Sequence, residues 1–168
     1  MPAPIQPHIL CRPGDIAPDV ILPGDPGRVL RMMKLLDKPR EISFNREYRV
    51  VTGSYRGRPV SICSTGIGGP AAAIAMEELI NIGAKVFIRV GSCGALADDV
   101  GLGDIIIAQG ASTDSKVNRI RFLDHDLAAL ADFGLLERAV RAARARRVPV
   151  RVGNVFSSDF FYTPQPQV

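Results

Sequence analysis

Short apolar segments alternate along the chain with longer segments of helical periodicity. Runs of three to six residues are rich in aliphatic and β-branched side chains, as is typical of buried strands. The run 86–90 is apolar except for Arg89, which is the pattern of a parallel strand covered on both faces. The predicted strands are 20–22, 59–63, 86–90, 104–108 and 150–155.

Helices are predicted between several of these strands. Asp25 and Pro26 are typical of an N-cap and a first helical position. A second helix is expected over 71–82, where Gly83 ends it. The positions that the first helix would bury are Val29, Leu30, Met33 and Leu36. The apolar positions of a further helix recur at helical spacing at Leu136, Ala139, Val140 and Ala143.

The order of these elements favours an α/β fold with right-handed crossovers, because strands and helices follow one another in turn. Residues 47–58 are the exception and predict a hairpin with its turn at Arg56 and Gly57. A length of 168 residues fits one domain with a substantial core.

Composition excludes several classes of protein. Hydrophobic residues make up 46% and charged residues 23%, which is ordinary for a globular chain. No apolar run approaches the roughly 18 residues of a membrane helix, and residues 1–7 lack the pattern of a secretory signal. Cys11, Cys63 and Cys93 are odd in number and widely spaced, which argues against disulfides and zinc. We therefore expect a cytoplasmic protein without a metal site.

The net charge of +4 raises the question of a nucleic-acid partner. Much of the excess lies between Arg138 and Arg151, mostly opposite the apolar side of the predicted helix. A solvated helix face is favoured over a nucleic-acid surface, because no aromatic residues interleave with the arginines. We expect neither a nucleic-acid nor a membrane partner.

Glycine-rich turns follow three of the predicted strands or stand at their ends. They span 22–28, 64–70 and 89–95. Glycine allows a close approach of the backbone to a ligand, and a helix N-terminus presents free N–H groups to an anion. Arg28 and Arg89 in these turns are suited to a bidentate grip on phosphate. Plain chain connections are the alternative for any one such turn, but three of them favour a phosphate-handling α/β enzyme.

Taken together, these segments resemble the nucleoside phosphorylases of the hexameric bacterial type, from about His8 to Tyr162. The motifs that carry the resemblance are 23–28, 89–95, 112–122, 124–126 and 157–162, with 45–48 and 63–70 closer to the uridine-specific branch than to the purine-specific one. The resemblance implies a three-layer fold with a mixed, mainly parallel central sheet, in a single domain over residues 1–168. It implies no cofactor beyond inorganic phosphate as co-substrate.

Residue roles follow from the same resemblance. Phosphate would be bound by Gly24, Arg28, Arg89 and Ser92, with Arg46 reaching it from a neighbouring subunit. The nucleoside would be bound by His8, Cys93, Gly94 and Phe161. His8 would touch the ribose 5′-hydroxyl in a neighbour's site, and Phe161 would stack on the base. The expected assembly is a homo-oligomer, a hexamer built from dimers.

Structural roles remain alternatives for these side chains. Arg28 could be solvated, and Arg89 could have a structural partner inside an apolar strand. His8 could be a surface residue of a Pro-rich segment, and Phe161 a core aromatic. The triplet 124–126 has the composition of a metal site, but adjacent residues do not converge on one ion, so a structural role is expected.

No Glu-Met-Glu segment, which binds the ribose in the family, occurs in this sequence. The resemblance implies that this segment and the Ser-Asp pair of the general acid come after the point where this chain ends. The general acid is expected beyond Val168, which predicts that the C-terminal part is missing and that the chain resembles about the first two-thirds of the family. Protonation of the leaving group by a general acid typically raises the reaction rate by about 10²–10⁴-fold.

Purine nucleoside phosphorylase is the leading hypothesis for the function. Uridine phosphorylase is the second, because Gln165 fits a uracil-binding position of that branch while Gln167 departs from it. A hydrolytic nucleosidase is disfavoured, since attack by water needs no cluster of arginines. A catalytically impaired protein that only binds phosphate or nucleoside is the alternative outside the enzyme class.

Overall fold

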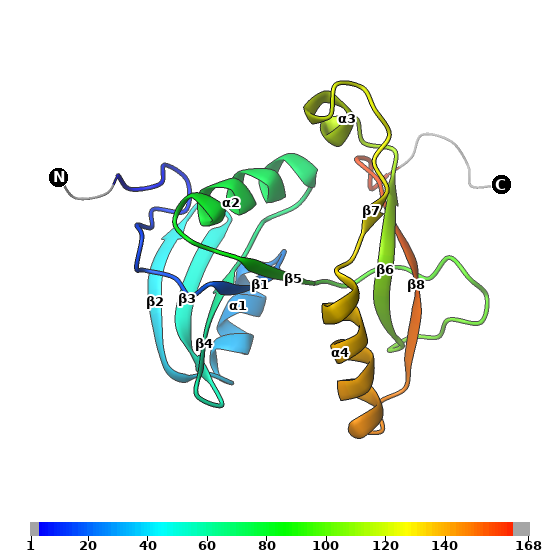
Figure 1. Cartoon of the computed structure of the whole chain (residues 1–168), viewed down its shortest axis with the longest axis horizontal. Helices are drawn as coiled ribbons and strands as arrows, with labels where there is room; N and C mark the ends of the chain where they lie inside the picture. Colours follow the sequence, from blue (N-terminus) through cyan, green and yellow to red (C-terminus); the bar gives the residue numbers. More distant parts are fainter. Residues whose placement is uncertain (1–3, 163–168) are drawn as a thin grey trace. The chain divides into compact units, whose positions relative to one another are not determined.

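The computed structural model of the protein describes residues 4–162. The chain divides into two compact units, one ending at Ser92 and the other starting at Cys93 (Figure 1). The mixed α/β fold expected from the sequence is confirmed, with strands in each unit. The single domain over residues 1–168 stays a prediction.

The strands of the first unit are β1 (Asp19–Pro23), β2 (Asp37–Asn45), β3 (Tyr48–Tyr55), β4 (Arg58–Cys63) and β5 (Val86–Val90). Within residues 4–92 they form a five-stranded sheet with the order β2-β3-β4-β1-β5. Pairing is parallel across β4, β1 and β5, and antiparallel across β2, β3 and β4. The parallel part brings the carboxyl ends of three strands to one edge.

Helices α1 (Pro26–Met33) and α2 (Gly69–Asn81) cover opposite faces of this sheet. Successive residues of a strand point to opposite faces, and Val50 and Val51 of β3 accordingly belong to different clusters. Val50 packs in the cluster that contains Leu79 of α2, and Val51 packs in the one that contains Val29 of α1. The first unit thus has the three layers that were predicted.

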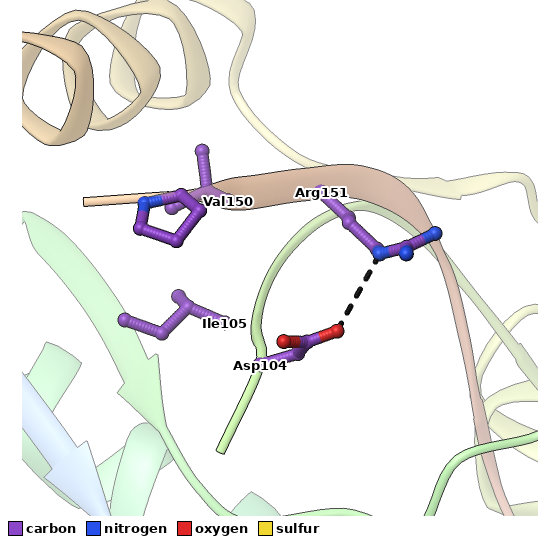
Figure 2. Close-up of a pocket in the computed structure, with 5 residues that line it drawn as sticks. Asp104, Ile105, Val150 and Arg151 are labelled. Atoms are coloured by element: carbon purple, nitrogen blue, oxygen red, sulfur yellow. Dashed lines mark ion pairs between the residues drawn. The ribbon is translucent and has the colours of Figure 1, made fainter. Parts of the chain in front are cut away.

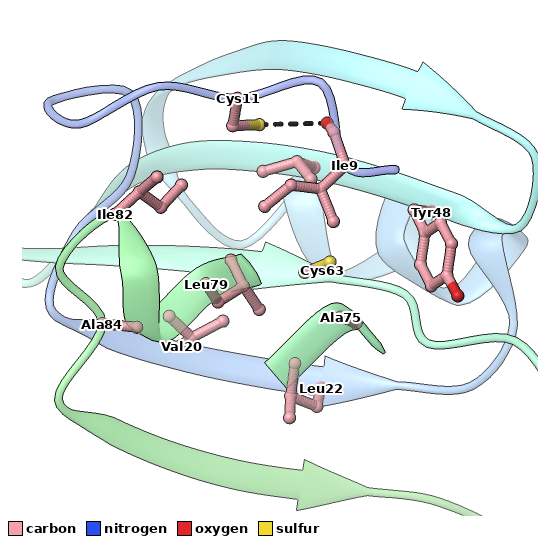
Figure 3. Close-up of a cluster of buried hydrophobic side chains, with 11 residues drawn as sticks. Ile9, Cys11, Val20, Leu22, Tyr48, Cys63, Ala75, Leu79, Ile82 and Ala84 are labelled. Atoms are coloured by element: carbon pink, nitrogen blue, oxygen red, sulfur yellow. Dashed lines mark hydrogen bonds between the residues drawn. The ribbon is translucent and has the colours of Figure 1, made fainter. Parts of the chain in front are cut away.

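The larger of these two clusters also takes in the N-terminal segment. Ile9 and Cys11 are fully buried against strands β1 and β3 and helix α2 (Figure 3). The segment before β1 is therefore part of the core of the first unit.

Local sequence signals start helix α1 as predicted. Asp25 caps α1, and its Oδ1 accepts a hydrogen bond of 2.7 Å from the Gly27 N–H. The prediction for Leu30 is wrong, because it is 40% exposed while Val29 faces the sheet. Helix α2 begins at Gly69, two residues before the predicted start at Ala71.

The predicted hairpin is also confirmed. Strands β3 and β4 pair from Tyr55 and Arg58 onward, with Arg56 and Gly57 at the turn. Both turn residues have positive φ (50° and 78°), the conformation that suits the twist of a two-residue hairpin.

Strand β2 was not predicted. Its first five residues, 37–41, are exposed and include charged side chains and a proline. The pairing with β3 also contains two register shifts. A polar, irregular strand at a sheet edge is a common protection against edge-to-edge association. Such a strand lacks the alternation of apolar and polar residues by which strands are predicted from sequence.

Strand β5 is less covered than its apolar sequence predicts. Ile88 and Val90 are 48% and 42% exposed. Within its sheet, β5 is an edge strand that pairs with β1 alone, so the expected burial on both faces is not observed.

The elements of the second unit are β6 (Ile105–Thr113), α3 (Val117–Arg121), β7 (Ala129–Leu130), α4 (Phe133–Ala145) and β8 (Val150–Ser157). Between residues 93 and 162 the sheet order is β7-β6-β8, with β6 and β8 parallel and β7 antiparallel. The two predicted strands at 104–108 and 150–155 are confirmed, whereas β7 and α3 were not predicted.

Helix α4 has the amphipathic character that its sequence predicts. Leu136, Val140 and Ala143 are half-buried, and Arg138, Arg141 and Arg144 are exposed. Ala139 was assigned to the apolar side and is exposed, which corrects that assignment. No helix among residues 4–162 has the length and hydropathy needed to cross a membrane.

Candidate functional site

The three glycine-rich turns lie at the carboxyl edge of the parallel strands of the first unit. Gly24 directly follows β1, Gly91 directly follows β5, and Gly66 comes three residues after β4. The Gly66 N–H donates a 2.9 Å hydrogen bond to the Gly24 carbonyl, and the Thr65 N–H donates to the Pro23 carbonyl. The three glycines thus share one edge of the sheet, and this edge is where open α/β sheets bind ligands.

Gly24 stands where two guanidinium groups converge. A Cβ atom added at Gly24 would lie 3.3 Å from Arg89 Nη2 and 3.8 Å from Arg28 Nη2. It would also lie 3.2 Å from the Gly66 carbonyl oxygen. The absence of a side chain at position 24 thus leaves the tips of both arginines unobstructed.

Gly66 is required for a different reason. Its φ is +68°, and an added Cβ would lie 2.6 Å from Glu47 Cγ. No side chain fits between the β4 turn and the β2–β3 turn without moving Glu47.

Arg89 is held by the strand edge. Its Nη1 donates to the carbonyls of Leu22 at 2.8 Å and Val90 at 3.3 Å, which leaves Nη2 toward Gly24. Burial lowers the pKa of the Arg89 guanidinium, and the positive charge of Arg28 lowers that pKa further. The guanidinium nevertheless stays charged, because arginine does not deprotonate in proteins.

Neither arginine of this pair has an acidic partner. Among residues 4–162, no carboxylate lies within ion-pair distance of Arg28 or Arg89. Arg28 also sits in the first turn of α1, where the helix dipole disfavours a cation. Two like charges, one of them in the first turn of a helix, favour the binding of an anion between them.

Arg46 occupies the turn between β2 and β3. It is exposed, with a φ of +53°, and the described residues give it no ion pair or side-chain hydrogen bond. The structure does not bring it to Gly24, so its part in a neighbour's phosphate site stays a prediction. Ser92 is exposed and follows Gly91 directly.

The predicted base-binding residues belong to the second unit. Cys93 and Gly94 begin it and are exposed. Phe161 is 90% exposed, with its ring edge-on to Tyr162 at a centroid distance of 5.0 Å. It is thus no core aromatic within the described chain, and its stacking role stays a prediction.

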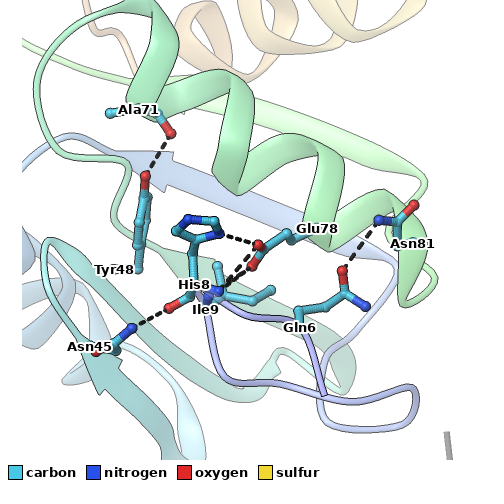
Figure 4. A network of polar contacts seen from close by, with 8 residues as sticks. All are labelled: Gln6, His8, Ile9, Asn45, Tyr48, Ala71, Glu78 and Asn81. Atoms are coloured by element: carbon cyan, nitrogen blue, oxygen red, sulfur yellow. Dashed lines mark hydrogen bonds and ion pairs between the residues drawn. The ribbon is translucent and has the colours of Figure 1, made fainter. Parts of the chain in front are cut away.

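His8 is firmly held, unlike a surface residue of a loose segment. Its Nδ1 lies 2.5 Å from Oε1 of Glu78 on α2, and its ring is edge-on to Tyr48 (Figure 4). Tyr48 donates its hydroxyl to the Ala71 carbonyl, and burial raises the pKa of this phenol to about 12.

Glu78, the partner of His8, was not among the residues predicted from the sequence. It is buried at 6% exposure on the same side of α2 as Ala75, Leu79 and Ile82. The spacing of positions 75, 78, 79 and 82 places an acid on the apolar face of a helix. A buried carboxylate requires hydrogen-bond partners. An acid on the apolar face of a predicted helix is therefore the signal by which Glu78 could have been found in the sequence.

The triplet 124–126 has a structural explanation. Arg119 Nε lies 3.0 Å from Asp124 Oδ1, and Arg119 Nη1 lies 3.4 Å from Asp126 Oδ1. Both acids of the triplet thus pair with one arginine of α3.

The second unit contains a cavity of about 290 Å³ away from the carboxyl ends of its parallel strands. It lies at the amino ends of β6 and β8 and is lined by Asp104, Ile105, Pro149, Val150 and Arg151 (Figure 2). Arg151 forms ion pairs with Asp99 and Asp104, which belong to the loop before β6. Ligands of parallel sheets bind at the opposite, carboxyl ends.

Comparison with known proteins decides the family. The model of the phosphorylase superfamily matches residues 18–168. The chain belongs to this superfamily. The matched range includes both arginines that converge on Gly24.

Two bacterial purine nucleoside phosphorylases show how similar this phosphorylase superfamily chain is to curated proteins. It is 54% identical over 164 residues to a DeoD-type 2 purine nucleoside phosphorylase of Vibrio vulnificus, covering 96% of this chain and 70% of that protein. A DeoD-type purine nucleoside phosphorylase of Photorhabdus laumondii is 51% identical, with 96% and 69% covered. The chain thus spans about 70% of the length of these relatives.

Solved structures of the superfamily match closely. A purine nucleoside phosphorylase of Toxoplasma gondii in complex with immucillin-H has a TM-score of 0.91 at 33% identity, covering 96% of this chain and 65% of that one. A uridine phosphorylase of Vibrio fischeri has a TM-score of 0.91 at 41% identity, with 98% and 67% covered. The fold of the chain is therefore that of the phosphorylases.

Proposed function

We propose that this chain acts as a purine nucleoside phosphorylase, an enzyme that converts a nucleoside and inorganic phosphate into a free base and ribose 1-phosphate or its deoxy form. The convergence of Arg28 and Arg89 on Gly24, with no carboxylate of the described residues to neutralise them, carries the proposal. The relatives at 51–54% identity, whose names specify purine nucleosides, support the choice of substrate.

In this reaction a phosphate oxygen forms a bond to C1′ of the ribose while the bond from C1′ to the base nitrogen breaks. The base leaves with the electron pair and takes up a proton. Positive charge develops on the sugar ring, so the nucleophile must be fixed close to C1′ and stripped of water. Arg28 and Arg89 supply the hydrogen-bond donors that fix the phosphate. We propose no cofactor besides inorganic phosphate as the co-substrate.

We propose roles for the remaining predicted residues as well. Ser92 would add a hydroxyl to the phosphate, and Cys93, Gly94 and Phe161 would contact the base. His8 and Arg46 would complete a neighbour's pocket, which makes a homo-oligomer, a hexamer built from dimers, part of the proposal. We assign no general acid among residues 4–162.

Uridine phosphorylase is the second candidate, favoured by the 41% identity to the Vibrio fischeri structure. Gln165 and Gln167, which bear on that choice, lie outside the described residues. The purine candidate is preferred because the identity to the purine-specific relatives is higher, at 54%.

The test is base release from inosine and from uridine, with and without inorganic phosphate, followed by chromatography. The proposal predicts hypoxanthine and ribose 1-phosphate only when phosphate is present, and faster turnover of inosine than of uridine. Faster turnover of uridine would favour the second candidate. Release of base without phosphate would contradict phosphorolysis, and phosphate binding without any turnover would indicate a protein that only binds its ligands.

A further inference from the structure

Glu78 binds three donors that all belong to one short stretch of the N-terminal segment. Its Oε2 accepts from the His8 N–H at 3.0 Å and from the Ile9 N–H at 2.8 Å. Its Oε1 faces His8 Nδ1 at 2.5 Å. The three contacts link positions about seventy residues apart in the chain, and Figure 4 shows them converging on one carboxylate.

The Glu78 carboxylate is the buried partner of this pair. The Glu78 side chain is 8% exposed, whereas that of His8 is 38% exposed. Asn45 Nδ2 donates to the His8 carbonyl at 2.8 Å, so the backbone N–H and C=O of His8 both have hydrogen-bond partners. A buried carboxylate is stable here because backbone and ring N–H groups replace its water.

This geometry determines which nitrogen of the imidazole carries the proton. An ionised carboxylate only accepts hydrogen bonds, so Nδ1 must donate to Oε1. In the neutral ring, Nε2 is then a free acceptor. The described residues offer Nε2 no hydrogen-bond partner.

We propose that Glu78 is a positioning residue, which locks the N-terminal segment and the Nδ1–H tautomer of His8 so that Nε2 accepts a hydrogen bond from a ligand hydroxyl. The ligand class is a donor of O–H groups, and under the proposed function it is a ribose hydroxyl of the nucleoside. This identification of the ligand rests on the proposed function, whereas the tautomer lock does not.

Glu78→Gln separates the lock from a purely structural role. The amide oxygen can keep the hydrogen bonds to the backbone N–H groups of His8 and Ile9. The amide NH₂ then faces Nδ1 and donates to it, which moves the ring proton to Nε2. The variant is isosteric, so the segment stays in place while the acceptor becomes a donor.

The first readout is nitrogen NMR of the full chain with labelled histidine in alkaline buffer. The chain contains only two histidines, His8 and His125, so His125 serves as an internal reference. We expect the Nδ1–H form for His8 in the wild type and the Nε2–H form in Glu78→Gln, with His125 unchanged. A mixture of tautomers at His8 in the wild type, or the same tautomer in both proteins, would overturn the proposal.

The second readout is nucleoside recognition. Glu78→Gln should raise KM for inosine by about tenfold, the scale of one net hydrogen bond, with kcat less affected. An inosine analogue that lacks the ribose hydroxyl bound by His8, which is expected from the family resemblance to be the 5′-hydroxyl, should show the same KM in the wild type and in Glu78→Gln. Glu137→Gln on α4, an exposed carboxylate in an i,i+4 pair, is the control and should change neither readout.

The outcomes separate the two proposals. An equal rise in KM for inosine and for every deoxy analogue would leave Glu78 with a structural role alone. A wild-type chain without phosphorolysis would reject the proposed function, and the nitrogen spectra would still decide the tautomer lock.

Discussion

Arg28 and Arg89 point their Nη2 atoms at one spot beside Gly24, although they come from a helix start and a strand sixty-one residues later. The positive charge of Arg28 contributes to the lowered pKa of Arg89. Such a pair is unfavourable by itself and becomes favourable when an anion lies between the two groups.

Gly24→Ala should weaken phosphate binding. The added Cβ would lie 3.2 Å from the Gly66 carbonyl and 3.3 Å from Arg89 Nη2, which displaces the guanidinium or the anion. We expect Kd for phosphate to rise about 5- to 150-fold, the equivalent of roughly 1–3 kcal/mol of overpacking. Isothermal titration calorimetry measures it.

Gly153→Ala in β8 is the matched control, because an added Cβ there meets nothing within 4 Å. It should leave phosphate binding unchanged. Equal affinity in Gly24→Ala and the wild type would place the anion elsewhere.

The three cysteines should differ in reactivity. Cys11 and Cys63 are buried, and burial raises the pKa of both thiols, whereas Cys93 is exposed. The thiolate is the reactive form, so the native protein should react rapidly with Ellman's reagent at one thiol and the denatured protein at all three.

Cys93 also reports on the base pocket. Saturating nucleoside should slow its modification if Cys93 lines that pocket. Unchanged modification in the presence of bound nucleoside would remove Cys93 from the proposed base site.

Local signals made much of the first unit predictable. Asp25 and Pro26 mark the start of α1, and Arg56-Gly57 marks the hairpin turn, because each depends on the conformation of a few adjacent residues. The shared edge of the three glycines follows from parallel pairing, in which all strands end on the same side.

Features that depend on distant partners were not predictable in the same way. Strand β2 has few apolar residues, because an edge strand needs little burial. The partner of His8 is Glu78, which is brought to it only by the packing of α2 on the sheet. Leu30 and Ala139 fit the helical pattern but fall at the margin of the buried face.

Self-association should accompany activity. If Arg46 completes a neighbour's phosphate site, Arg46→Ala should weaken phosphate binding while the protein sediments as an oligomer with two-fold interfaces. Arg56→Ala is a close control, because both arginines are exposed at turns with φ near +50°. A protein that sediments only as a monomer at micromolar concentration, or equal effects of both variants, would contradict this part of the account.

Thermal unfolding at increasing phosphate concentration shows whether Arg28 and Arg89 bind phosphate. A ligand that binds only the native state stabilises it by RT ln(1 + [L]/Kd), so Tm of the wild type should rise with phosphate concentration. Arg89→Ala should abolish the rise, since a hydrogen bond to a charged group contributes about 1.5–3 kcal/mol. Arg89→Lys should restore part of it, because a point charge lacks the bidentate fork.

Arg144→Ala, on the exposed side of α4, should leave the rise in Tm unchanged. The comparison uses the increment caused by phosphate in each variant, because Arg89 also bonds the Leu22 carbonyl and its loss lowers Tm by itself. We expect a full increment in Tm for the wild type and Arg144→Ala, and none for Arg89→Ala. No increment in the wild type, or equal losses in Arg89→Ala and Arg144→Ala, would contradict this expectation.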